Sequence, residues 1–110
     1  MSMAVDDLTD RIRPLLPQNG RIEEKRMFGG LAIMLDGNMA VCPTKEGSLI
    51  VRVGKDGMGE ALRAGATPME MGGRTMSGFV LVTGDALEDD EALAGWVARA
   101  VGFVRTLPAK

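Results

Sequence analysis

The chain has 110 residues, 45% hydrophobic and 25% charged, which is enough for one globular domain with its own core. Its net charge of -2 and its pI of about 5.1 provide no global positive field, which argues against direct nucleic-acid binding. With three Phe, one Trp and no Tyr, few aromatic side chains are left to stack on bases.

The N-terminal sequence and the single cysteine predict a cytoplasmic protein. Asp6 and Asp7 stand where a signal peptide needs positive charge, and no apolar block follows them. No stretch approaches 18 uninterrupted apolar residues, so no membrane span is expected. Cys42 is the only cysteine, which rules out an intrachain disulfide and fits a reducing compartment.

The first predicted element is an amphipathic helix over residues 5–16, because apolar side chains recur there at helical spacing. Pro14 has no backbone N–H to donate to the carbonyl four residues earlier. We therefore expect the helix to kink or to end early at that point.

Between Ile22 and Val53 the apolar period changes to two, which predicts three antiparallel strands. The strongest hairpin signal is Asp36-Gly37 between L-A-I-M-L and N-M-A-V-C, since both central residues of a type I′ turn need positive φ. A second turn around residues 45–47 leads into S-L-I-V-R-V.

A weaker helix is predicted over residues 56–64, followed by a second hairpin whose turn is Gly72-Gly73. The clearest helix is the last one, which begins at an acidic run and places one apolar stripe toward the core. That stripe comprises Leu93, Trp96, Val97, Ala100, Val101, Val104 and Leu107. The acids of the run, Asp89, Asp90 and Glu91, are explained by their favourable interaction with the helix dipole.

The predicted order is therefore helix, three strands, helix, two strands, helix. Strands joined as hairpins indicate an antiparallel sheet, and the helices are expected to cover one face of it. This is a two-layer α+β fold in a single domain, residues 1–110.

Most catalytic and metal chemistry is absent from the sequence. The chain has no histidine, which removes the commonest general base and the histidine-based zinc sites. Cys42 lies in an apolar strand without an imidazole partner and is interpreted as an inert buried thiol. The side chains of the carboxylate doublets Glu23-Glu24 and Asp89-Asp90 diverge on a strand or helix, so neither doublet converges on a substrate. Met69 and Met71 are interpreted as core filler and not as copper ligands. No cofactor and no metal site are predicted.

Two glycine-rich segments raise the question of a phosphate site. In K-R-M-F-G-G, residues 25–30, the pair Gly29-Gly30 precedes a strand and not a helix, so we interpret Met27, Phe28 and the two glycines as a structural motif with a bulge or close backbone approach. The segment from Gly54 to Gly59 runs from a strand into a helix but lacks a phosphate-loop pattern.

Several of these motifs together resemble a known family. R-M-F-G-G, L-A-I-M-L-D-G-N-M, L-I-V-R-V, R-T-M-S-G-F-V-L-V and the final D-D-E-A-L-A-G-W-V-A-R-A are similar to the N-terminal domain of the TfoX/Sxy competence regulators. The resemblance covers essentially the whole chain. It implies a secretion-chaperone-like α+β domain, a stand-alone relative lacking the C-terminal domain, and no established catalytic residues.

We therefore expect a non-enzymatic regulatory or protein-interaction module with an unknown protein partner. Arg26, Arg52 and Arg74 are the candidate binding residues, because cations among apolar neighbours can anchor acidic partners. That all three are only solvated or paired within the fold stays open. The alternative function is a small-ligand or nucleotide-binding domain that uses Gly29-Gly30 or the Gly54 to Gly59 loop. An enzyme is a third possibility, and its catalysis would have to use Lys, Asp or Glu because there is no histidine. A homodimer is expected if a sheet edge or Met-rich patch is exposed.

Overall fold

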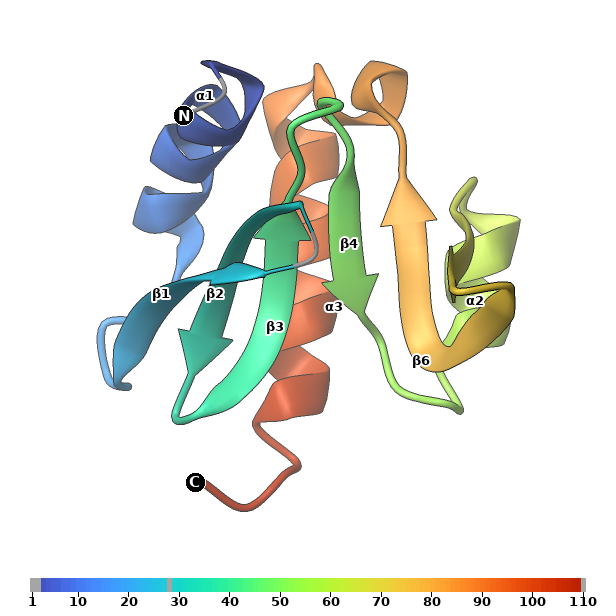
Figure 1. Cartoon of the computed structure of the whole chain (residues 1–110). Coiled ribbons are helices and arrows are strands. Elements are labelled where there is room, and N and C mark those ends of the chain that lie inside the picture. The colour runs from blue at the N-terminus through green and yellow to red at the C-terminus, as the bar shows by residue number, and fades with distance from the viewer. Residues whose placement is uncertain (1–2, 28, 110) are drawn as a thin grey trace.

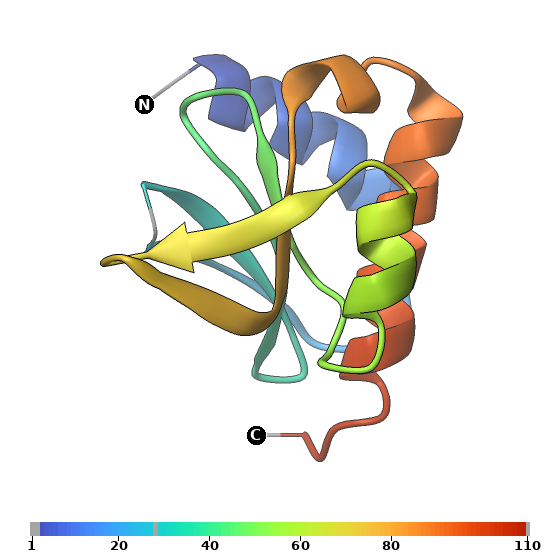
Figure 2. The same cartoon turned by 90° about the vertical axis from the view of Figure 1, so that its right-hand side faces the viewer.

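The helices and strands are seen in a computed structural model that describes residues 3–27 and 29–109 (Figure 1). In chain order they are α1 (Met3–Ile12), the 3₁₀ turn η1 (Arg13–Leu15), β1 (Ile22–Met27), β2 (Gly30–Leu35), β3 (Asn38–Pro43), β4 (Leu49–Arg52), α2 (Met58–Arg63), β5 (Thr67–Met71), β6 (Arg74–Val82), the 3₁₀ turn η2 (Gly84–Leu87) and α3 (Asp90–Val104). The described strands form one sheet in the order β1-β2-β3-β4-β6-β5, and all neighbours are antiparallel. The helices lie on one face of this sheet (Figure 2), which confirms the predicted two-layer α+β fold.

The first run of strands has four members, so the prediction of three was wrong. The strand that was missed is β1, I-E-E-K-R-M, whose four consecutive charged residues hide any apolar alternation. It pairs with β2 along its whole length, from Ile22 opposite Leu35 to Met27 opposite Gly30. Backbone hydrogen bonds therefore hold β1 at the edge of the sheet, and most of its side chains stay exposed.

The first helix ends early, as its proline predicts. α1 stops at Ile12, and Pro14 lies within the 3₁₀ turn that follows. A proline at the start of such a turn needs no backbone N–H there. The chain then crosses to the edge of the sheet at Ile22.

The Asp36-Gly37 turn joins β2 to β3 with the backbone that the sequence predicts. Both residues have positive φ, 52° at Asp36 and 86° at Gly37. The Asp36 side chain also accepts a hydrogen bond from the backbone N–H of Arg21 at 3.0 Å. This second contact fixes the segment that enters β1 against the turn.

The main core lies between α3 and the sheet. Five residues of the predicted stripe of α3 are buried, and Asp89 caps this helix by accepting from the Ala92 N–H at 3.1 Å. The sheet side of this core comes from Ile33, Leu35, Val41, Leu49, Val51, Val80 and Val82. Alternate residues of the same strands must therefore point to the opposite side of the sheet.

That opposite side, which we call the open sheet face, carries a second apolar cluster. Its buried members are Ala32, Met39, Cys42 and Ile50, and its partly buried members are Met34, Met69, Phe79 and Leu81. Bulges in β2 and β5 bend the sheet, and the β5–β6 hairpin projects away from the helices (Figure 2). The helices leave this cluster uncovered.

Candidate functional site

The three candidate arginines do not form one site. Arg26 is on the edge strand β1, Arg52 on β4 and Arg74 at the start of β6. Arg52 shares the face of Ile50, and its guanidinium lies between the open sheet face and α3. It is 5.4 Å from the ring centre of Phe79 and 5.7 Å from that of Phe103 on α3. It also donates to the Met39 carbonyl at 3.5 Å. That each arginine contacts a partner stays a prediction.

The glycine pair of K-R-M-F-G-G has a clear geometric requirement, while Phe28 lies outside the described residues. Gly29 has a φ of 71°, in the left-handed region that glycine adopts easily. A Cβ at Gly30 would lie 2.0 Å from the carbonyl oxygen of Pro43 on β3. Gly30 is therefore the point at which the β1–β2 hairpin makes a close backbone approach to β3.

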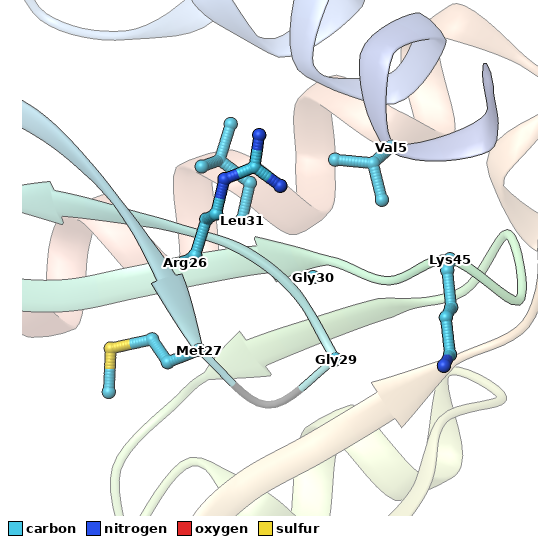
Figure 3. A pocket seen from close by; sticks show the side chains of 7 residues that line it. All are labelled: Val5, Arg26, Met27, Gly29, Gly30, Leu31 and Lys45. Carbon is cyan, nitrogen blue, oxygen red and sulfur yellow. The ribbon is translucent and has the colours of Figure 1, made fainter. Parts of the chain in front are cut away.

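The same motif borders a cavity of about 400 Å³, which we call the hairpin cavity (Figure 3). Arg26 extends from β1 toward α1, and Lys45 lies across the opening from it (Figure 3). The lining is completed by Val5, Met27, Gly29, Gly30 and Leu31. The structure thus brings Arg26 and the glycine pair, which were singled out for different reasons, to one place.

A second cavity of about 450 Å³ lies between α1 and β1, and we call it the helix cavity. It shares Arg26 and Leu31 with the hairpin cavity, so the two adjoin. Its other lining residues are Asp6, Thr9, Asp10, Arg13 and Glu24. None of these five was chosen from the sequence as a candidate binding residue.

Arg13 organises the charges of the helix cavity. It donates two hydrogen bonds to Glu24, each of 2.9 Å, and one to Asp10, also 2.9 Å. The hydrogen bonds from Arg13 hold the pKa of Glu24 below its ordinary value, although partial burial works the other way. One guanidinium therefore neutralises two of the three carboxylates that line the cavity.

The Gly54 to Gly59 loop is organised for packing. The Gly54 N–H donates to the Gly78 carbonyl at 3.0 Å, and the Gly57 N–H donates to the Gly54 carbonyl at 3.2 Å. A Cβ at Gly54 would lie 2.3 Å from the ring of Phe103. Since these backbone donors are already used, the loop does not offer them to a phosphate group.

The thiol of Cys42 is fully buried on the open sheet face. Burial raises its pKa to about 11, so the thiol is protonated at neutral pH. Within residues 3–27 and 29–109, no three His, Cys, Asp or Glu side chains gather in a way that could hold a metal ion. No helix in that part of the chain has the length and apolar character to cross a bilayer.

Comparison with protein families gives a match to the TfoX N-terminal domain over residues 14–104. The chain belongs to the TfoX N-terminal domain family. This confirms the resemblance drawn from R-M-F-G-G and the hairpins that follow it. No curated protein matches the chain. The matched part of this TfoX N-terminal domain runs from η1 to the end of α3, so the α1 wall of the helix cavity precedes it.

From the sequence alone, most residues of the helix cavity and of the open sheet face of this TfoX N-terminal domain were not predicted to form a site. Recognising β1 as a strand would have placed Glu24 and Arg26 on one face, because they are two residues apart. Nothing in the sequence signals that Thr9 lines the same cavity as Glu24 and Arg26, since that depends on how α1 packs. The open sheet face was signalled only by the alternation of Ile50 and Arg52 with buried neighbours.

Proposed function

We propose that the protein is a non-enzymatic regulatory module that binds another protein through its open sheet face. Membership of the TfoX N-terminal domain family supports a competence-regulator-like role. The observation that carries the choice of surface is the apolar cluster on the side of the sheet opposite the helices. An uncovered apolar surface rimmed by polar residues is typical of protein interaction sites.

The composition of the open sheet face suits partner binding. Met34, Met69, Phe79 and Leu81 are partly exposed there, above buried Met39 and Ile50. Methionine side chains are flexible and polarizable, so they repack easily against a partner. An aromatic ring such as Phe79 supplies a large contact area with few rotatable bonds.

Arg52 gives this surface its charge specificity. Its guanidinium is held over Phe79 and Phe103 and is anchored by the Met39 carbonyl, so its position is fixed before binding. A fixed guanidinium can donate two parallel hydrogen bonds to a carboxylate. The partner that fits is therefore a protein segment with apolar side chains and an acidic residue that reaches Arg52.

The proposal of a non-enzymatic role is supported by the chemistry of the titratable groups. The chain has no histidine, and its one thiol is protonated and buried. Glu23 and Glu24 point to opposite faces of β1, where Glu23 pairs with Arg21 at 3.3 Å and Glu24 with Arg13. This carboxylate doublet is therefore not poised for acid–base work at one substrate.

Affinity purification from the native cell with chemical cross-linking tests the proposal. The test variant is Met69→Glu on the open sheet face, and the control is Leu62→Glu on α2, where Leu62 is 38% exposed. We expect Met69→Glu to lose the captured partner by at least tenfold, while Leu62→Glu retains it. Unchanged capture of the partner by Met69→Glu would contradict the proposal. If a second copy of this chain were the only protein captured, the open sheet face would be assigned to a homodimer instead.

A further inference from the structure

The hairpin cavity and the helix cavity adjoin on the side of the molecule away from the open sheet face, and we call the two together the cleft. They meet at Arg26 and Leu31, which line both. Glu24, Arg26 and Leu31 point to the helix side of the sheet because they share the face of buried Ile33. With volumes of about 400 and 450 Å³, each part lies within the size range of small-molecule sites.

The hydroxyl of Thr9 has no hydrogen-bond partner at the wall of this cleft. Thr9 is 2% exposed, lines the helix cavity, and its Oγ1 is buried without a donor or acceptor among the described residues. A threonine inside a helix usually donates to a carbonyl one turn earlier, and this one does not. A buried polar group left in this way is costly, so it needs a reason.

The charges of the cleft leave one guanidinium unpaired. Arg13 is occupied by Asp10 and Glu24. The guanidinium of Arg26, by contrast, makes no ion pair, hydrogen bond or ring contact with the residues that the structure describes, and it extends toward α1 (Figure 3). Asp6 lines the helix cavity and likewise has no ion-pair partner within 4.0 Å in that part of the chain.

We propose that this cleft binds a small molecule that carries an oxyanion at one end and hydrogen-bond donors at the other. Arg26 would hold the carboxylate or phosphate in the fork of its guanidinium, toward the hairpin cavity. Thr9 would supply the buried hydroxyl, and Asp6 would accept from an ammonium or hydroxyl group of the ligand. This small-ligand site goes beyond the proposed protein-binding role and uses different residues, so either can fail without the other.

Titrations followed by amide NMR test the site with four probes. Acetate and inorganic phosphate carry the oxyanion alone, whereas serine and phosphoethanolamine add an ammonium group to a carboxylate or a phosphate. We expect saturable shifts confined to residues 6–13 and 23–31, with at least tenfold tighter binding of the bifunctional member of one pair. The favoured pair identifies the oxyanion. Shifts spread over the whole surface, or none with any probe, would overturn the proposal.

Three variants assign the contacts. Arg26→Gln should weaken binding of the best probe at least tenfold. The control Arg63→Gln, at an exposed arginine on α2, should leave it unchanged. Thr9→Val should weaken binding at least threefold and yet raise Tm by about 4 °C, because it removes an unpartnered hydroxyl and keeps the shape. Full affinity in Arg26→Gln or in Thr9→Val would contradict the assignment, and the rise in Tm shows that the second variant folds.

Discussion

At the scale of single residues, the structure distinguishes a glycine that close packing requires from one that it does not require. Gly30 lies so close to β3 that a side chain has no room, whereas a Cβ at Gly95 on α3 would meet no atom within 4 Å beyond the neighbouring part of its own helix. A side chain is therefore excluded at the first position and tolerated at the second. Sequence alone shows both glycines but not which backbone lies opposite them.

Replacing these glycines by alanine should change stability in opposite directions. Gly30→Ala should lower the free energy of unfolding by about 3 kcal/mol, because Cβ collides with the Pro43 carbonyl. Gly95→Ala should raise it by about 0.5–1 kcal/mol, since alanine is the better helix former. Urea denaturation of both variants measures these changes. An unchanged free energy of unfolding in Gly30→Ala would contradict the close approach.

The Arg13–Glu24 pair makes stability depend on pH. Because the folded pKa of Glu24 is lower than its unfolded value near 4.5, its contribution is complete above that value and is lost as pH falls through the folded pKa. Glu24→Gln should therefore be less stable than the original protein at pH 7, and the two should converge in acid. Denaturation curves from neutral to acidic pH measure this. A difference that grows in acid would contradict the sign.

At the scale of elements, local signals predicted the parts of the fold that depend on local chemistry. Pro14 ends α1, and Asp36-Gly37 makes the β2–β3 turn, because backbone sterics at those residues decide the outcome. The edge strand β1 was missed because its pairing with β2 stabilises it and its own side chains do not. The helix cavity was missed for the same kind of reason, since Thr9 and Glu24 line one cavity only after α1 packs.

The N-terminus of α3 offers a test at this scale. Asp89→Ala should lower the free energy of unfolding by about 1 kcal/mol, because the Ala92 N–H loses its acceptor. Asp85→Ala is the control, since Asp85 lies in η2, ahead of the α3 cap. Thermal denaturation of the two variants should show a drop for Asp89→Ala alone, and equal drops would indicate a general charge effect.

At the scale of the whole molecule, the bent sheet separates the two sides for which binding is proposed. One side has α1, the cleft and the unpaired Arg26, and the other has the methionine-lined open sheet face with Arg52. At the outer edge, β1 bears consecutive charges, which discourage pairing with another strand. Association is therefore expected through the open sheet face and not through the edge at β1.

Site-specific photo-crosslinking in the native cell tests the central claim most directly. A photoreactive amino acid is placed at Met69 on the open sheet face or, in the control, at Leu62 on α2. The proposed role predicts a discrete crosslinked partner protein from position 69 and none from position 62. Partner adducts from position 62 without any from position 69 would contradict it.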